Sequence, residues 1–206
     1  LCIMTALSKM PLAETTAVAF AAPVIVVILA RPLLGEEIGP LRWAAVAIGF
    51  AGVLLIARPG GGLSIAGLAW AGAGALFLAL YQILTRQLSG KENPVTMLFY
   101  TALVGSVVMT PWLPWIWGGP DPAALDWVLA LSMGVLGGTG HFLLIRAFRE
   151  AAASLLAPII YAQLPVATLF GWLVFQHTPA PGAFLGIGVI AVAGALLAWE
   201  SRRREA

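Results

Sequence analysis

Apolar residues occur along the chain in long blocks, which are separated by short segments rich in proline, glycine and charged residues. Seven of these blocks contain 17 to 24 residues each. A helix rises about 1.5 Å per residue, so blocks of this length cross the roughly 30 Å hydrocarbon core of a bilayer. We therefore predict seven membrane-spanning helices, at residues 15–34, 41–57, 65–84, 95–113, 127–145, 152–175 and 183–199.

The sixth block differs from a helix that only anchors a chain. It carries no charge over residues 152–175, yet it contains Pro158 and Pro165, with Tyr161 and Gln163 between them. Each proline removes a backbone donor and leaves a carbonyl one turn earlier without its helical partner. In lipid such a carbonyl needs another partner or a wet cavity. We therefore predict that this helix lines a pathway.

The composition predicts an integral membrane protein. Hydrophobic residues make up 61% of the 206 and charged residues only 10%, and the mean hydropathy is +0.96. A soluble domain has about 25% charged residues. The net charge of +2 and the single basic cluster, at residues 202–204, exclude a nucleic-acid binder. His141 and His177 are isolated and Cys2 is the one cysteine, so we predict no metal site, no cofactor and no internal disulfide.

Lysine and arginine predict the orientation in the membrane. With the C-terminus in the cytoplasm, nine of these residues lie inside and only Lys9 and Arg58 lie outside. We therefore predict a multi-pass protein of a bacterial-type inner (plasma) membrane with a cytoplasmic C-terminus. The outer loop between the fourth and fifth spans contains Trp112, Trp115 and Trp117. These tryptophans are typical of an interfacial aromatic belt, and a pore role is the alternative.

Two regions of the chain resemble each other at an offset of 141 to 142 residues. Residues 6–37 align with residues 147–177, and Pro23 matches Pro165. The spans that follow also match, at Ile48 with Ile190, Gly52 with Gly194, Leu54 with Leu196 and Leu55 with Leu197. Five crossings, an odd number, separate the copies, so the second copy is inverted. An inverted repeat with broken helices is typical of a secondary transporter; a chance alignment of apolar helices is the alternative.

Short motifs in both copies resemble EamA-type members of the drug/metabolite transporter superfamily. In the first copy these are Pro-Leu-Ala-Glu-Thr-Thr, Ala-Ala-Pro and Leu-Gly-Glu, at residues 11–16, 21–23 and 34–36. In the second they are Ala-Ser-Leu-Leu-Ala-Pro and Gly-Trp-Leu-Val-Phe, at residues 153–158 and 171–175, with Tyr161 and Gln163 between. The second copy departs from the family at Gln176-His177, where a pair like Gly35-Glu36 is usual.

This resemblance implies ten membrane helices in two five-helix halves. Residues 1–57 would be the C-terminal part of the first EamA repeat, and residues 58–206 the second repeat. The apolar residues 1–7 are too short to span a bilayer, so we expect them to end the third helix of a longer protein. The fold class is therefore an all-α integral membrane bundle of inverted five-helix repeats, with seven complete transmembrane helices in this fragment of a ten-helix fold.

Polar residues at membrane depth are costly in lipid, so we expect them to face the bundle interior. The candidate substrate-binding residues are Tyr161, Gln163, Pro23, Pro165, Tyr100 and His141. For Tyr161 and Gln163 the alternative is ordinary hydrogen bonding between helices. For Tyr100 it is interfacial anchoring, which we favour, and for His141 it is a fixed hydrogen bond.

No aspartate or glutamate lies at mid-membrane depth in the seven predicted spans. Proton-driven transporters commonly carry such carboxylates. We therefore expect any coupling to use Glu14, His141 or a group in helices outside this sequence, with facilitated exchange as an equal alternative. Glu14 also suits a purely local role, since a carboxylate is favourable at the N-terminal end of a helix dipole.

The predicted function is that of a permease that moves small metabolites by alternating access. The resemblance implies amino acids or related compounds as cargo. The predicted partners are the lipid bilayer and the metabolite, and a homodimer is a further candidate. One alternative is a membrane interaction protein that transports nothing. An integral-membrane enzyme is the less favoured alternative, because it would need titratable residues that converge near one interface, and the sequence shows no such catalytic cluster.

Overall fold

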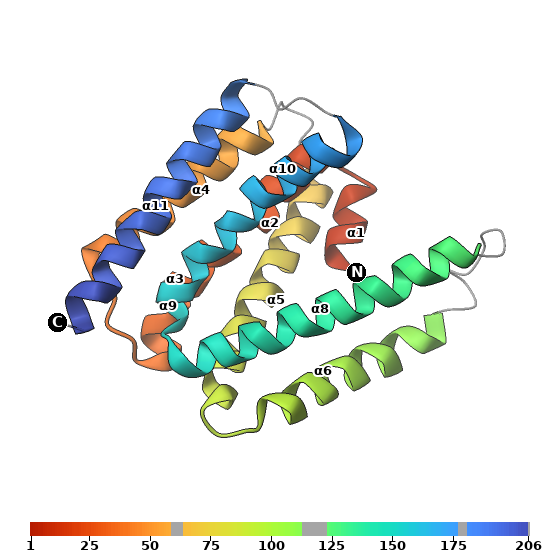
Figure 1. Cartoon of the computed structure of the whole chain (residues 1–206), viewed down its shortest axis with the longest axis horizontal. Coiled ribbons are helices and arrows are strands. Elements are labelled where there is room, and N and C mark those ends of the chain that lie inside the picture. The colour runs from red at the N-terminus through yellow and green to blue at the C-terminus, as the bar shows by residue number, and fades with distance from the viewer. Residues whose placement is uncertain (59–63, 113–122, 177–180, 206) are drawn as a thin grey trace. The chain divides into compact units, whose positions relative to one another are not determined.

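The computed structural model describes residues 1–58, 64–112, 123–176 and 181–205, which form helices and no strand (Figure 1). Seven helical segments are long and apolar enough to cross a membrane, and each coincides with a predicted span. They are Leu12–Leu34, Pro40–Ala57, Ile65–Ser89, Pro94–Trp112, Ala124–Glu150, Ala153–Val174 and Pro181–Trp199. The predicted all-α, multi-pass architecture is therefore confirmed.

The chain divides into two compact units, which we describe separately. Unit 1 contains Leu1–Leu84 and Ala152–Ala206, and unit 2 contains Thr85–Ala151. These units differ from the predicted repeats at residues 1–57 and 58–206, because packing joins helices from both repeats in unit 1. The division into repeats stays a prediction.

The first span of unit 1 consists of two helices, α2 (Leu12–Ala19) and α3 (Ala22–Leu34), with a break at Phe20 and Ala21. Pro23 lies in the first turn of α3. Proline is tolerated there because the first amides of a helix have no intrahelical acceptor. The predicted kink at Pro23 therefore takes the form of a new helix start just after the break.

The sixth span is also broken. It consists of α9 (Ala153–Leu156), the 3₁₀ segment η2 (Ala157–Ala162) and α10 (Gln163–Phe175). Pro158 begins the tighter η2 segment, whereas Pro165 lies in the first turn of α10. Each proline thus follows a change in the helix, and Pro165, like Pro23, occupies a first turn where its missing amide has no helical acceptor to lose. Mid-helix 3₁₀ segments of this length are uncommon and often mark hinges.

Helices α4 (Pro40–Ala57) and α11 (Pro181–Glu205) lie side by side along their lengths (Figure 1). Gly52 faces Gly186 and Ile190, whereas Ile56, further along α4, faces Gly186, which comes earlier in α11. The two helices therefore run antiparallel. They are corresponding helices of the predicted repeats, so their opposite directions are those that an inverted repeat requires.

The short α1 (Cys2–Leu7) packs on α5 (Ile65–Ser89) where α5 carries small residues. A Cβ atom at Gly74 would lie 2.7 Å from Ile3 Cδ1, and one at Gly67 would lie 2.8 Å from Met10 Cβ. Ala71, with 0% exposure, joins Met10 in the same apolar cluster. Close approach of backbones at small residues is the usual packing mode of membrane helices.

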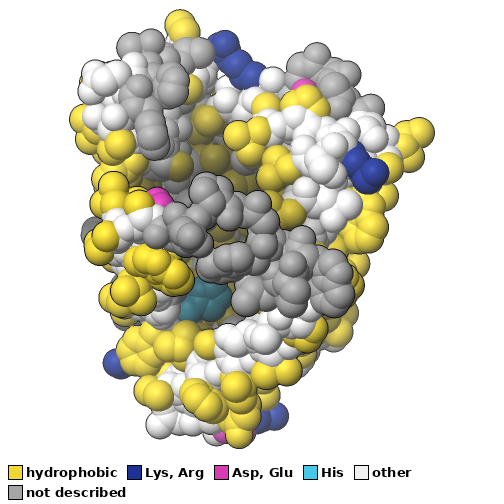
Figure 2. All heavy atoms as spheres, turned by 90° about the vertical axis from the view of Figure 1, so that its right-hand side faces the viewer, with side chains coloured by type: hydrophobic (Ala, Val, Ile, Leu, Met, Phe, Trp, Pro, Cys, Tyr) yellow, Lys and Arg dark blue, Asp and Glu magenta, His cyan; other side chains and the backbone are white. Residues whose placement is uncertain are grey.

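Unit 2 contains α6 (Pro94–Met109), a short 3₁₀ turn η1 (Thr110–Trp112) and α8 (Ala124–Glu150). The Asn93 side chain caps α6 by accepting a hydrogen bond from the Val95 amide at 2.9 Å. Both helices expose apolar side chains, as expected for a lipid-facing surface. Hydrophobic side chains also predominate on the described surface that Figure 2 shows. Trp115 and Trp117 of the predicted aromatic belt lie outside the described residues.

Candidate functional site

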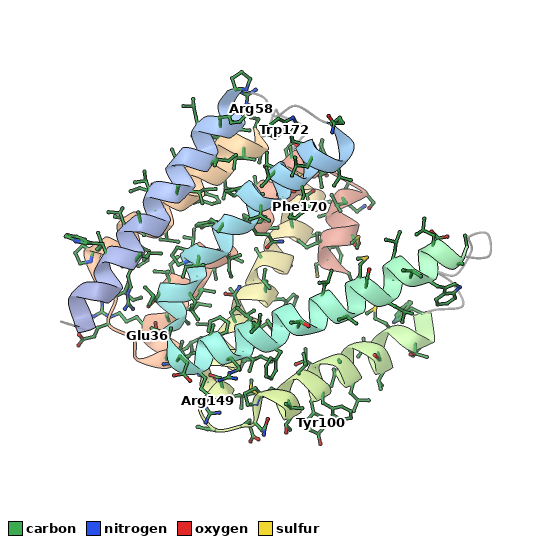
Figure 3. The ribbon with its side chains drawn as sticks, in the orientation of Figure 1. Glu36, Arg58, Tyr100, Arg149, Phe170 and Trp172 are labelled. Atoms are coloured by element: carbon green, nitrogen blue, oxygen red, sulfur yellow. The ribbon has the colours of Figure 1, made fainter. Side chains whose placement is uncertain are left out.

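The end of the first span is tied to the start of the sixth by Glu36. Its carboxylate accepts hydrogen bonds from the Ala153 amide at 2.7 Å, the Ser154 amide at 3.0 Å and the Ser154 hydroxyl at 2.5 Å. Figure 3 shows Glu36 at the end of α3, beside the start of α9. A carboxylate at a helix N-terminus satisfies amides that have no helical acceptor and interacts favourably with the dipole. The cap here comes from a residue more than 110 positions away in sequence.

Arg42 completes this junction. Its Nη1 donates a hydrogen bond to the Ser154 hydroxyl at 2.6 Å, and that hydroxyl donates in turn to Glu36. Arg42 is 5% exposed and Ser154 is fully buried. Buried charges are stable only when they are paired and hydrogen-bonded. We call Glu36, Arg42 and Ser154 the polar junction, which joins the first, second and sixth spans.

The two breaks meet at an aromatic contact. Tyr161, in η2, stacks on Phe20, in the break between α2 and α3, with ring centroids 6.4 Å apart and planes inclined by 29°. The Tyr161 ring also packs against Gly49 of α4, where a Cβ would collide with it. Tyr161 is fully buried, and its hydroxyl has no hydrogen-bond partner among the described residues. The candidate site is therefore a packed junction of two broken spans.

Four of the six predicted site residues lie on these two spans. Tyr161 is buried at the contact, and Pro23 is buried in α3, which packs against η2. Pro165 is half-buried and Gln163 is exposed at the start of α10. In this conformation the buried Tyr161 packs against its neighbours and does not line an open cavity, whereas the Gln163 side chain is exposed.

The remaining two predicted residues, Tyr100 and His141, belong to unit 2. Tyr100 is 59% exposed on α6 (Figure 3), and its ring meets that of Phe99 edge-on at 5.6 Å. His141 is exposed on α8. Because they lie in the other unit, their role in the candidate site stays a prediction. His177, which occupies the place of a glutamate in the second repeat, lies outside the described residues.

The polar junction was missed by reasoning from sequence. From the sequence, Arg42 was only one of the nine basic residues placed inside, and Glu36 was part of a motif with an expected structural or interfacial role. A signal was nevertheless present, because Arg42 is the one charged residue in the apolar run 41–57 and such a residue needs a partner. Glu14 lies in the first turn of α2, where the local role at a helix start was expected, and it is 4% exposed.

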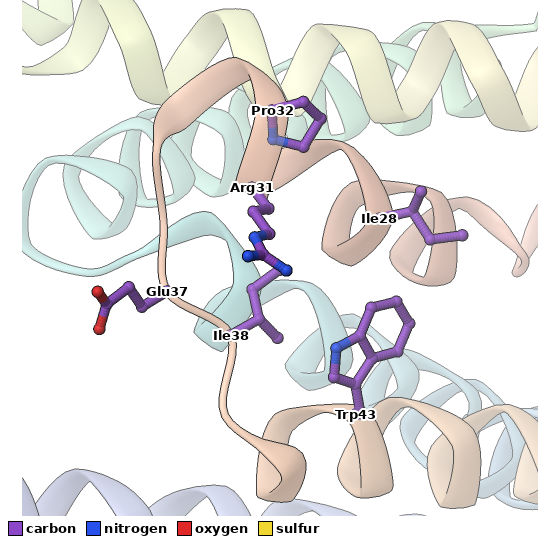
Figure 4. A pocket seen from close by; sticks show the side chains of 6 residues that line it. All are labelled: Ile28, Arg31, Pro32, Glu37, Ile38 and Trp43. Atoms are coloured by element: carbon purple, nitrogen blue, oxygen red, sulfur yellow. The ribbon is translucent and has the colours of Figure 1, made fainter.

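A shallow pocket of about 370 Å³ lies where the chain turns from α3 to α4. Figure 4 shows the Arg31 side chain extending toward Ile38, with Trp43 to one side, whereas Glu37 points away from it. Its wall includes Ile28 and Trp43, which are 51% and 42% exposed. The pocket therefore opens on the outside of unit 1 rather than at the contact between the breaks. Within the described part of the chain, no group of three His, Cys, Asp or Glu residues could hold a metal ion.

Comparisons with known proteins agree with this architecture. The sequence profile described as the EamA-like transporter family matches residues 1–58 and 65–199. A riboflavin transporter from Rhizobium johnstonii is 31% identical over 206 residues, which cover 97% of this chain and 66% of that protein. An S-adenosylmethionine uptake transporter from Rickettsia bellii is 26% identical over 197 residues, which cover 96% of this chain and 67% of that protein.

The chain thus spans about two thirds of the length of these relatives. Both relatives are named as transporters and not as enzymes. A solved crystal structure matches 96% of this chain and 72% of its own with a TM-score of 0.84 and 20% sequence identity. That match establishes the fold alone.

Proposed function

Since the chain belongs to the EamA-like transporter family, we propose that it is a secondary transporter that moves a small polar metabolite by alternating access. The contact between Tyr161 and Phe20 carries this proposal, because it brings together the breaks of two antiparallel spans. Transporters commonly bind their substrates where interrupted helices of inverted repeats meet. The membrane is a bacterial-type inner membrane, with the C-terminus in the cytoplasm as the arginines predict.

The packing around Tyr161 supports a movement at the breaks. A buried hydroxyl without a hydrogen-bond partner costs about 1–3 kcal/mol relative to a satisfied one. A rearrangement that exposes the Tyr161 hydroxyl to substrate or water recovers that energy. The 3₁₀ geometry of η2 provides a segment that changes its hydrogen bonding at modest cost, because such bonds are weaker than those of an α-helix. In the proposed cycle η2 moves away from Gly49 and Phe20, and Tyr161 and Gln163 then contact the substrate.

The polar junction supports movement about a fixed end. Glu36 and Arg42 hold the start of α9 by four hydrogen bonds. Glu36 accepts from the Ala153 amide, the Ser154 amide and the Ser154 hydroxyl, and Arg42 donates to the same hydroxyl. These bonds involve ionised groups and are the stronger kind. In our proposal the junction therefore acts as the pivot, on the predicted cytoplasmic side, and the spans separate beyond it. The cargo is a small polar metabolite, and amino acids and related compounds are the class implied by the sequence.

Transport by reconstituted protein tests the proposal. Proteoliposomes would be loaded or bathed with radiolabelled riboflavin, S-adenosylmethionine and a set of amino acids, and flux compared with that of protein-free vesicles. We expect saturable flux of at least one compound and a loss of about tenfold or more in Gln163→Ala, with normal membrane insertion. Thr101→Val is the matched control, because Thr101 is an exposed polar residue on α6 whose hydroxyl bonds to the Met97 carbonyl of its own helix.

Each component of the proposal fails on a different result. Unchanged flux in Gln163→Ala would remove this residue from the site. Absence of flux for every compound, with correctly inserted protein, would instead favour the membrane interaction protein that transports nothing.

A further inference from the structure

We propose that unit 2 carries a binding site for the phosphate of an anionic phospholipid, formed by Arg146 and Arg149 of α8 at the start of α6. The two arginines line a pocket of about 410 Å³ together with Asn93, Val95, Phe142 and Glu150. This inference is independent of the proposed transport cycle, because its residues take no part in the contact between the broken spans.

The residues that line the pocket include apolar side chains beside the two arginines. Phe142, Arg146 and Arg149 are four and three positions apart, so they share one face of the helix. Val95 lies opposite on α6, which packs against α8, and is 61% exposed. Apolar side chains therefore adjoin two guanidinium groups, as a lipid headgroup with its attached acyl chains requires.

The guanidinium groups of Arg146 and Arg149 do not cap the C-terminus of their own helix. The last carbonyls of α8, those of Phe148 and Arg149, accept hydrogen bonds from Arg86 Nη1, with 3.2 Å to the Arg149 oxygen. Arg86 thus satisfies the C-terminus of α8. The side chains of Arg146 and Arg149 are exposed and form no hydrogen bond or ion pair with other described residues. Their donors remain available for a phosphate, which guanidinium groups bind in a bidentate manner.

The local charge favours an anion but only moderately. Glu150 also lines the pocket, so the three ionised side chains sum to one positive charge. The positive end of the α6 dipole adds to this field, although the Val95 amide is already occupied by Asn93. The negative end of the α8 dipole opposes it, but the carbonyls of Phe148 and Arg149 there are bonded to the Arg86 guanidinium. Removing the charge of Glu150 should therefore strengthen binding, which a nonspecific apolar pocket would not show.

The surroundings favour a lipid over a free phosphate. In the described part of the chain, none of the most apolar 18-residue window of α6 and only 6% of that of α8 is buried. Phe99, one turn beyond Val95 on α6, is 60% exposed and continues the apolar side of the pocket along the helix. An acyl chain would lie along this surface while its phosphate contacts the arginines at the interface, where long basic side chains reach headgroups.

Native mass spectrometry of the detergent-solubilised protein tests the site. The protein would be titrated with dioleoylphosphatidylglycerol, dioleoylphosphatidylcholine or inorganic phosphate. We expect phosphatidylglycerol to bind more tightly than phosphatidylcholine. We also expect the double variant Arg146→Gln/Arg149→Gln to lose about tenfold or more in that affinity, since each charge-assisted bond carries more than a neutral one. Glu150→Gln should bind more tightly than wild type, and the double Arg→Lys variant should fall between wild type and double Gln.

Arg31→Gln is the matched control, because Arg31 is also exposed at the end of a span but lines a pocket without a second arginine. It should leave phosphatidylglycerol binding unchanged. Equal binding in wild type and the double Gln variant, both with native unfolding midpoints, would overturn the proposal. Displacement of the lipid by millimolar inorganic phosphate would overturn the assignment to a lipid and assign the site to a free phosphate.

Discussion

The carboxylate of Glu36 caps a helix of the other predicted repeat, by accepting hydrogen bonds from the amide and hydroxyl of Ser154 at 3.0 and 2.5 Å. The first span ends where the sixth begins, so the two broken spans run in opposite directions. The pair formed by α4 and α11 is antiparallel as well. Both observations support an inverted relationship between the repeats.

Loss of the Glu36 carboxylate should destabilise the protein. We expect Glu36→Ala to lower the free energy of unfolding by about 1–3 kcal/mol, because two amides and one hydroxyl lose a charged acceptor. Glu36→Gln should cost less, since an amide oxygen still accepts hydrogen bonds. Thermal unfolding in detergent, followed by tryptophan fluorescence, would measure both. Glu37→Ala is the control, because the neighbouring Glu37 is exposed and points away from Arg31 in Figure 4; an equal loss in both variants would contradict the assignment.

Arg42 and Ser154 should show coupled effects on stability. The Ser154 hydroxyl accepts from Arg42 and donates to Glu36, so removal of either residue breaks the same chain of hydrogen bonds. We expect Arg42→Ala and Ser154→Ala to be non-additive, with a coupling energy of about 0.5–3 kcal/mol in a double-mutant cycle. Additive losses would show that the contact between them contributes nothing beyond the separate environments of the two residues.

The spans could be predicted from sequence because each is a long apolar block with clear ends. Pro40 and Arg58, for example, bound a helix that the structure ends at Ala57. Two matched positions of the predicted repeat share one local conformation. Gly35 and Gln176, aligned in the two copies, both end their helices in the left-handed conformation, with φ of 67° and 55°. Some helices extend beyond the predicted spans, as at the polar residues 85–89 of α5.

The site could be predicted only in part. Prolines and polar residues indicated the broken spans, because their cost in lipid is a local property of the sequence. The stacking of Tyr161 on Phe20, and the capping of α9 by Glu36, depend on which helices become neighbours, and no local pattern states that. Tyr161 was expected to line a cavity, yet its ring fills the space that Gly49 leaves free. Whether it reaches a substrate in another conformation stays a prediction.

Gly186→Ala should weaken the contact between α4 and α11. A Cβ atom there would lie 2.7 Å from the Gly52 carbonyl oxygen and 2.6 Å from Ile56 Cγ1. A backbone oxygen cannot move aside without separating the helices, so we expect a loss of about 1–3 kcal/mol from overpacking. Gly188→Ala, on the same helix with no described atom within 4 Å, is the matched control. It should gain up to about 1 kcal/mol from helix propensity, and equal losses in both variants would refute the packing argument.

Gly35→Ala should be destabilising although the space around it is open. No described atom lies within 4 Å of the added Cβ, so the cost comes only from the left-handed backbone and should be about 1–2 kcal/mol. The control is Gln176→Gly. Relief of the same strain there is offset by the added chain entropy of glycine and by loss of the 3.1 Å hydrogen bond to the Leu173 carbonyl. We expect its unfolding midpoint to stay within about 2 °C of wild type or to rise.

Two substitutions of Tyr161 test its contribution to stability apart from its contribution to transport. Its hydroxyl has no hydrogen-bond partner among the described residues, so Tyr161→Phe should leave the free energy of unfolding unchanged or raise it by about 1 kcal/mol. Tyr161→Ala should lower it by about 3–5 kcal/mol, because it removes a fully buried ring and leaves a cavity beside Phe20 and Gly49.

Flux through proteoliposomes then distinguishes the two roles of this ring. If the hydroxyl contacts substrate once η2 moves, Tyr161→Phe should reduce transport several-fold at undiminished stability, and the effect should depend on the substrate tested. If Tyr161 serves packing alone, Tyr161→Phe should transport at the wild-type rate. That result would confine the substrate contacts of the broken spans to residues such as Gln163, whose amide is already exposed.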